Sequence, residues 1–241
     1  MDKIIVKNLN IFYKDTALVN NVSMNIQSGK ITALLGLSGS GKSLIATAIM
    51  GYVANNLKLS GSICLDDNSK QNIACIMQNP RTAFNPLFSI KNCFYETLKA
   101  RNLKIDNEYI KEILNKVKLN ESVLNLYPHE CSGGMLQRIM IALALVSRAK
   151  FIIADEPTSD LDLISQAAVL DILEEISSKI GILLITHDFG VVARLADYVY
   201  VMDNTRIVEE ATCIDIFKNP QANITKELIN SHLSLYGVSN A

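Results

Sequence analysis

The sequence lacks the cysteine and histidine patterns that mark a disulfide framework or a metal centre. Five cysteines are irregularly spaced, and no C-x-x-C pair occurs among the 241 residues. An odd count without regular spacing predicts reduced thiols, as in a cytosolic protein. The three histidines, His129, His187 and His232, lie far apart along the chain. We therefore expect no metal-ligand cluster built from these residue types.

The charge balance and the apolar runs exclude further classes. Lys+Arg 23 against Asp+Glu 24 leaves a formal charge of -1, so no overall basic excess points to a nucleic-acid partner. Hydrophobic residues make up 49%, yet the longest apolar run, Ile139–Val146, is too short to cross a bilayer. The first ten residues predict no secretory leader. A high apolar content without a span suggests a deep core and a surface buried against a partner.

What the sequence does contain is the phosphate-loop pattern G-x-x-x-x-G-K-[ST], as GLSGSGKS from Gly36 to Ser43. The apolar run before it predicts a buried strand, and the run after it, Ser43–Tyr52, predicts a helix. A glycine loop between strand and helix lets N–H groups close around a polyphosphate. Lys42 would reach the β- and γ-phosphates, and the Ser43 hydroxyl would bind Mg²⁺. The alternative is a glycine-rich turn that matches by chance.

The order of the other elements predicts an α/β protein. Residues 4–30 read as two antiparallel strands, and the chain then alternates between strand-like and helix-like runs. We expect a mainly parallel sheet with ligands at the carboxyl ends of its strands. Residues 88–150 have helical periodicity, so we expect one domain over 1–241 with a core of 1–87 and 151–241 and an inserted helical subdomain at about 88–150. No internal repeat or low-complexity linker interrupts it.

Polar residues follow three of the predicted strands. Asp155 ends the apolar run FIIAD, where phosphate-loop enzymes hold Mg²⁺, and Glu156 could orient or deprotonate the attacking water. His187 follows the run GILLIT, and its place at the same sheet edge favours a γ-phosphate contact over a structural role. Gln78 follows IACIM and leads into the helical segment, which suits a sensor better than an ordinary loop residue.

A second anion site is predicted at CSGG, where Ser132 is a natural N-cap of a long apolar helix. Gly133 and Gly134 leave backbone N–H groups unshielded at the positive helix end. Alone, this pattern usually marks only a cap. One nucleotide hardly needs two phosphate-binding ends from the same chain, so two chains arranged head to tail would enclose it.

These residues together resemble the ATP-binding subunits of ABC transporters, over nearly the whole chain. GLSGSGKS resembles the Walker A loop, CSGGMLQR the ABC signature, FIIADE the Walker B strand with its catalytic glutamate, and SDLD (159–162) the D-loop. The resemblance implies a phosphate-loop (RecA-like) core with an N-terminal antiparallel β layer, and ATP and Mg²⁺ as cofactors. It also implies the following roles: catalysis by Glu156, His187 and Gln78; Mg²⁺ binding by Ser43, Gln78 and Asp155; ATP binding by Tyr13, Gly36, Ser38, Gly39, Ser40, Gly41, Lys42, Ser43 and Leu44; contact with the partner's ATP by Ser132, Gly133, Gly134 and Asp162.

Some positions depart from the family pattern or leave a choice. Tyr13 falls where the family stacks an aromatic ring on adenine, with Phe12 as the alternative. Cys131 and Met135 replace the usual leucine and glutamine of the signature. Leu44 replaces a frequent threonine, which removes one hydroxyl contact to the nucleotide.

Longer segments, such as MQNPRTAFNP and THDFGVVARLAD, resemble the peptide/nickel importer group of that family. Cys213 stands alone where peptide importers often carry a cysteine cluster, which favours nickel. The resemblance implies a peripheral subunit on the cytoplasmic face of the inner membrane. Its partners would be a second, different ATP-binding subunit, two permeases and an extracytoplasmic binding protein, with no nucleic acid.

Three alternatives to this reading stay open. They are import of peptides or another metal chelate, a soluble ABC ATPase, and a phosphate-loop kinase. The chain has neither the coiled-coil insertion nor the second ATPase domain that soluble types need, and CSGG and SDLD argue against a kinase.

Overall fold

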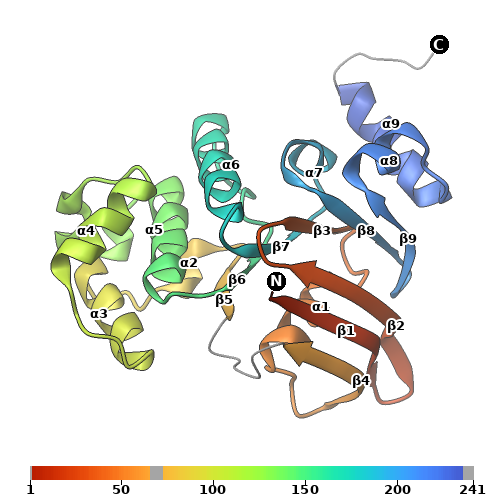
Figure 1. Ribbon diagram of the computed structural model, residues 1–241, viewed down its shortest axis with the longest axis horizontal. Coiled ribbons are helices and arrows are strands. Elements are labelled where there is room, and N and C mark those ends of the chain that lie inside the picture. The colour runs from red at the N-terminus through yellow and green to blue at the C-terminus, as the bar shows by residue number, and fades with distance from the viewer. Residues whose placement is uncertain (1, 66–72, 236–241) are drawn as a thin grey trace. The chain divides into compact units, whose positions relative to one another are not determined.

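A computed structural model describes residues 2–65 and 73–235 of the chain (Figure 1). The chain divides into two compact units, Met1–Lys70 with Gly181–Ala241, and Gln71–Ile180. The predicted helical subdomain at about 88–150 falls inside the second unit, whose described residues also form two strands and two further helices. Its boundaries remain a prediction. The polar run that follows Leu65 predicts a turn between two strands, and it lies outside the described residues.

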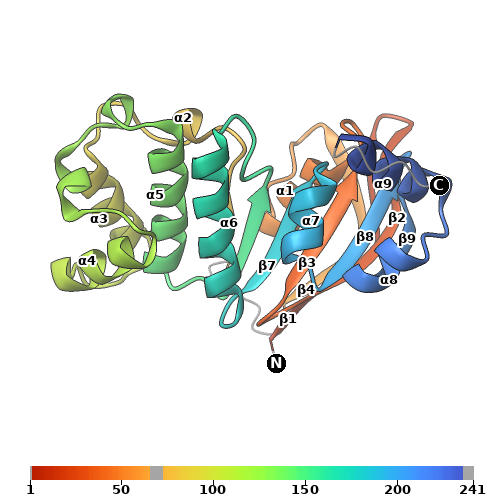
Figure 2. The same ribbon diagram turned by 90° about the horizontal axis from the view of Figure 1, so that it is seen from above.

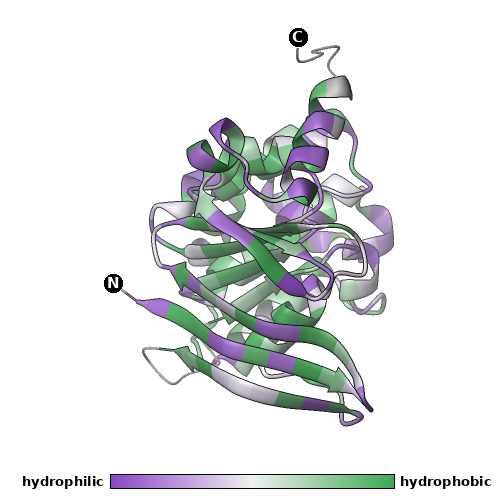
Figure 3. Ribbon diagram, turned by 90° about the vertical axis from the view of Figure 1, so that its right-hand side faces the viewer, coloured by the Kyte–Doolittle hydropathy of each residue, from purple (hydrophilic) through white to green (hydrophobic). Residues whose placement is uncertain are grey.

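The first unit begins with an antiparallel sheet in the order β2-β1-β4. Its strands are β1 (Lys3–Tyr13), β2 (Thr16–Gln27) and β4 (Leu57–Leu65). Polar and apolar residues alternate along β1 and β2 (Figure 3), and the inward-facing Ile4, Leu9 and Ile11 are fully buried. The predicted antiparallel pair is therefore confirmed, and β4 adds a third strand along β1.

Parallel pairing dominates the rest of the first unit. Strand β3 (Ile31–Gly36) lies between β7 (Gly181–Thr186) and β8 (Tyr198–Asp203), parallel to both, and β9 (Arg206–Thr212) runs antiparallel to β8. All six residues of β3 and of β7 are buried, as their mostly apolar sequences lead us to expect. The described residues of this unit form four helices: α1 (Lys42–Met50), α7 (Phe189–Leu195), α8 (Cys213–Lys218) and α9 (Asn223–Leu235). Helix α7 lies across β3 and β7 (Figure 2).

The second unit pairs β5 (Ile73–Ile76) in parallel with β6 (Phe151–Asp155) and is otherwise helical. Its helices are α2 (Pro80–Ala83), α3 (Ile90–Ala100), α4 (Asn107–Lys116), the 3₁₀ helices η2 (Glu121–Asn125) and η3 (Pro128–Glu130), α5 (Gly133–Val146) and α6 (Leu163–Ser177). Helices α5 and α6 lie side by side (Figure 2). No helix within the described ranges is long and apolar enough to cross a membrane.

The predicted fold class is confirmed by these elements, with an antiparallel N-terminal layer, mainly parallel pairing and helices. Short polar caps explain where several helices begin. The side chains of Ser89, Asp106 and Ser132 accept backbone N–H groups from the first turns of α3, α4 and α5. The carboxyl ends of β3, β5, β6 and β7 lead to the phosphate loop, Gln78, Glu156 and His187, and open α/β sheets bind ligands at such ends.

Candidate functional site

The phosphate loop of the first unit passes too close to neighbouring backbone to carry side chains at two of its glycines. A Cβ on Gly36 would collide with the carbonyl oxygen of Met202. Gly41 has a φ of +107°, and a Cβ there would lie 2.6 Å from the carbonyl oxygen of Leu18. Glycine at these two positions therefore leaves the adjacent backbone N–H groups uncovered by a side chain.

Helix α1 begins at the loop without any side-chain cap. Its N-cap is Gly41, and its first turn contains no acidic residue. The first N–H groups of a helix have no partner within the helix, so this end can take an anion. Ser40 supports that reading, because its hydroxyl is buried and has no hydrogen-bond partner among the described residues.

Lys42 folds its ammonium group back onto the loop. Its Nζ donates to the carbonyl oxygens of Gly36 and Leu37, at 2.7 and 2.8 Å. The residue is 7% exposed, although its charge lies beside the helix N-terminus that would receive phosphates. A buried cation at that position favours binding of a strongly charged anion.

His187 lies at the same sheet edge as the phosphate loop. It follows β7, whose last residue, Thr186, pairs in register with Leu35 of β3, one residue before Gly36. The hydroxyl of Thr186 accepts the N–H of Asp188 at 3.0 Å, which fixes the turn that carries His187. The predicted neighbourhood of the histidine and the loop is thus present within one unit.

Tyr13 ends β1 in the first unit with a ring that is 42% exposed. The ammonium group of Lys14 lies 5.5 Å from the centre of that ring. Phe12, the alternative, is half-buried. Of the two aromatic rings, Tyr13 is the more open to stacking on a planar ligand.

In the second unit, Gln78 and Asp155 come to one sheet edge. Strands β5 and β6 are parallel, and Ile76 pairs with Ala154, so both side chains follow the carboxyl ends of adjacent strands. Glu156 has a left-handed backbone with a φ of 48°, and the Ser159 hydroxyl donates to its Oε2 at 3.4 Å. A non-glycine residue in this region is strained, and such strain gathers at functional sites.

The charge of Asp155 is felt by its neighbour on β5. Burial and, to a smaller extent, the negative charge of Asp155 together raise the pKa of the Cys75 thiol to about 11. A thiol with that pKa stays protonated near neutral pH, so Cys75 is no nucleophile here.

The predicted second anion site lies at the start of α5. The Ser132 hydroxyl caps the helix by accepting the N–H of Met135 at 3.2 Å, so the sequence-based cap is confirmed. A Cβ on Gly134 would collide with the Ser165 hydroxyl of α6. Gly134 therefore also permits the close approach of the two helices, and the CSGG motif by itself does not predict that role.

Asp162 is joined to this group through Ser165. The carboxylate of Asp162 caps α6 by accepting the N–H groups of Ile164 and Ser165, and the Ser165 hydroxyl donates to its Oδ2 at 2.7 Å. These hydrogen bonds, led by that of the Ser165 side chain, lower the pKa of Asp162. The structure thus brings the signature residues and the D-loop aspartate into one cluster.

Arg138 is a further residue of this cluster that the motif did not single out. Its Nη1 donates to the carbonyl oxygen of Lys118 at 2.8 Å, and its Nε donates to that of Gly134 at 3.2 Å. The signal was available, because an arginine four residues after Gly134 lies one helical turn further along the same face.

Oxygen atoms of the kind that Mg²⁺ prefers are present in each unit. Among the described residues, no group of three or more His, Cys, Asp or Glu could hold a metal ion. Mg²⁺ commonly takes one or two protein oxygens and completes its shell with phosphate and water. Ser43 offers an exposed hydroxyl in the first turn of α1, and Asp155 of the other unit offers a carboxylate at the end of β6.

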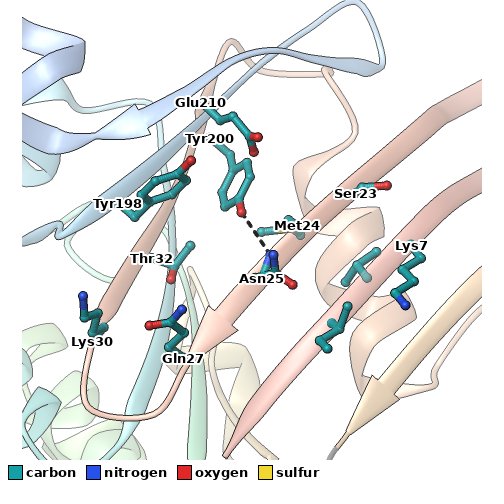
Figure 4. Close-up of a pocket in the computed structure, with 12 residues that line it drawn as sticks. Lys7, Ser23, Met24, Asn25, Gln27, Lys30, Thr32, Tyr198, Tyr200 and Glu210 are labelled. Carbon is teal, nitrogen blue, oxygen red and sulfur yellow. Dashed lines mark hydrogen bonds between the residues drawn. The ribbon is translucent and has the colours of Figure 1, made fainter. Parts of the chain in front are cut away.

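A hollow of about 460 Å³ lies in the first unit away from these residues (Figure 4). It is lined by the starts of β3 and β8, including Thr32 and Tyr198, whereas the phosphate loop follows the other end of β3. The Tyr200 hydroxyl accepts the N–H of Asn25 there at 3.1 Å and so joins β8 to β2. No predicted site residue lines this hollow, so its size does not identify the functional site.

Comparison with known families and proteins adds an independent line. Residues 19–159 match the family model described as ABC transporter. Over 92% of this chain and 90% of theirs, the nickel import ATP-binding proteins NikD of Brucella abortus and of Rhodospirillum rubrum are each 45% identical to it. The oligopeptide transport ATP-binding protein OppD of Lactococcus lactis is 39% identical over 92% of this chain and 72% of its own length.

Solved structures resemble the chain over almost its full length. One, described as an ATP binding subunit of an ABC transporter, has a TM-score of 0.79 with 25% identity and covers 93% of this chain and 98% of its own. Another is cbiO1 from Clostridium perfringens, part of the ABC transporter complex cbiONQ, with a TM-score of 0.77, 25% identity and coverage of 97% and 96%.

Proposed function

The chain belongs to the ABC transporter family, and from that membership we propose that it powers the uptake of nickel through partner permeases. It is an ATP-binding subunit of an ABC importer and couples ATP hydrolysis to transport. The cargo rests on one observation, the 45% identity with nickel import proteins over 92% of the chain. The runner-up is peptide import, which the 39% identity with a peptide importer subunit favours.

The loop from Gly36 to Ser43, with Leu44, holds the phosphates of ATP in this proposal, and Tyr13 stacks on adenine. The residues present fit such a ligand. Within the described part of the chain, the buried Ser40 hydroxyl has no hydrogen-bond partner and helix α1 has no side-chain cap, while Lys42 supplies a buried positive charge beside it. Ser38, Gly39 and Gly41 complete the loop.

Catalysis is proposed to use residues from the carboxyl ends of the strands. Bound Mg²⁺, held by Ser43, Gln78 and Asp155, would neutralise the charge that develops on the phosphates. Glu156 takes a proton from the attacking water, and His187 contacts the γ-phosphate and senses its loss. Gln78 passes that change to the permease through the segment that follows it.

A complete ATP site in this proposal needs two chains. Ser132, Gly133, Gly134 and Asp162 contact the nucleotide on the partner, because the positive end of helix α5 attracts its γ-phosphate. The partner is a second, different ATP-binding subunit. The pair sits on the cytoplasmic face of the membrane with two permeases and receives cargo from an extracytoplasmic binding protein.

Ser132→Arg tests this composite site. We expect the isolated chain to bind ATP as the wild type does, while the assembled complex loses hydrolysis at the partner's loop, because a bulky cation fills the helix N-terminus. ATP titration of the isolated chain and turnover of the complex measure the two effects. Ser122→Arg, at an exposed serine of η2, is the matched control. Full turnover of the Ser132→Arg complex would remove Ser132 from the site.

Deleting the gene tests the cargo. Uptake of radioactive nickel should fall to the background level, nickel enzymes should lose activity, and excess external nickel should restore them. Restoring the gene with Glu156→Gln should not rescue uptake, because transport needs hydrolysis. Normal nickel uptake together with impaired peptide uptake would assign the chain to the runner-up.

A further inference from the structure

The turn that carries His187 is fixed on one side by helix α7, which begins two residues later. Asp188 caps that helix, and its Oδ1 accepts the N–H groups of Gly190 and Val191 at 2.7 and 3.3 Å. Any shift of the first turn of α7 is therefore passed to Asp188 and to the residue before it.

Two C-terminal helices hold this first turn. Phe189 is 2% exposed, and its ring packs edge-on against Phe217 of α8, with 4.7 Å between ring centres. The ring of Phe189 also lies near the ring of His232 from α9, with 6.4 Å between the two ring centres. Ile216 of α8 and Ile229 of α9 belong to the same buried cluster (α7, α8 and α9 in Figure 2).

The ring of His232 also lies close to the backbone of Gly190. A Cβ placed on Gly190 would lie 2.7 Å from Cε1 and 3.4 Å from Nε2 of His232. The imidazole ring thus fills the space that the missing side chain leaves. Because cores are close-packed, removing the ring leaves a gap into which α7 can move, and adding a Cβ pushes the two helices apart.

We propose that His232 is a positioning residue for hydrolysis, whose ring holds the start of α7 and thereby sets the position of His187. The inference rests on the proposed role of His187 at the γ-phosphate. Helix α9 then influences the rate of hydrolysis indirectly, because a displacement of α9 away from α7 changes that rate without any contact between α9 and the nucleotide. The ring fills the space beside Gly190, so phenylalanine, which keeps a ring there, should replace it better than alanine.

The experiment measures kcat, KM for ATP and nucleotide Kd on the assembled transporter. His232→Ala should lower kcat about tenfold, because small displacements of a catalytic group cost up to a hundredfold, and should leave nucleotide Kd unchanged. His232→Phe should recover most of kcat. Glu227→Ala, at an exposed position of the same helix, is the matched control and should behave as the wild type.

A double-mutant cycle with Gly190→Ala isolates the contact. A Cβ on Gly190 would also lie 3.2 Å from Oδ1 of Asp188, so Gly190→Ala should lower kcat slightly in either background. The loss should be much larger when His232 is present, because its ring would lie only 2.7 Å from that Cβ. Equal effects in both backgrounds would overturn the inference. If His232→Ala fails to fold, a wild-type kcat for Gly190→Ala would overturn it equally.

His187→Ala separates the two levels of the argument. A complex that keeps wild-type turnover with His187→Ala contradicts the proposed function and not merely the role of His232. A complex that loses turnover with His187→Ala but keeps it with His232→Ala contradicts the positioning role alone.

Discussion

Replacing Glu156 by glutamine should leave ATP binding intact and slow hydrolysis by about two to four powers of ten, the scale expected for losing a general base. Glutamine has the same shape but cannot take a proton from water. Asp155 remains to bind Mg²⁺, so affinity should not fall. The variant should accumulate as an ATP-bound closed pair, which size-exclusion chromatography and single-turnover hydrolysis measure.

The backbone at Glu156 makes glutamine the sharpest substitution. The φ of 48° is a property of the backbone at Glu156, and the Ser159 hydroxyl donates a hydrogen bond to its side chain. The side-chain oxygen of glutamine can accept the same hydrogen bond. Glu174→Gln, at an exposed position on α6, removes a carboxylate from the same unit without touching the site and should turn over normally. Turnover of Glu156→Gln at the wild-type rate would end the assignment.

Much of the fold could be predicted because its signals are local. The mostly apolar runs of β3 and β7 predict buried parallel strands, and the alternation of polar and apolar residues in β1 predicts an antiparallel layer. Which strands pair with one another is harder to predict from the sequence. β4 and β5 follow one another in sequence, yet β4 pairs with β1 and β5 with β6, since pairing depends on contacts between distant segments.

Helix α2 shows a different limit. The pair Asn79-Pro80 is typical of a break between elements, but in the structure the Asn79 side chain caps a short helix by accepting the N–H of Arg81, with proline in the first turn. Proline is also favoured at the start of a helix, so the same pair fits two different structures and the sequence alone does not choose between them.

The site was predictable where residue type and spacing carry the chemistry, as in the phosphate loop. Contacts made between segments were not. Gly134 lies close to Ser165, and Gly190 lies close to His232, although the residues of each pair are far apart in sequence. Neither segment of a pair contains a pattern that predicts contact with the other. Similarly, only the folded backbone reveals the left-handed conformation of Glu156.

Lys42→Ala should abolish transport and weaken ATP binding by on the order of a hundredfold. Each hydrogen bond from a charged group contributes roughly 1.5–3 kcal/mol, and the lysine is expected to make such bonds to the β- and γ-phosphates. Fluorescence titration with ATP measures the loss. Thermal unfolding should then show little stabilisation by ATP, because a ligand stabilises only the state that it binds.

The same lysine also holds the loop through Gly36 and Leu37, so the change has a structural component that must be separated. Comparing unfolding temperatures without nucleotide gives that component. Lys58→Ala removes an exposed lysine from β4 of the same unit and should keep wild-type affinity. If Lys42→Ala melts like the wild type and still binds ATP normally, the ammonium group serves only the loop, and the phosphates must be bound elsewhere.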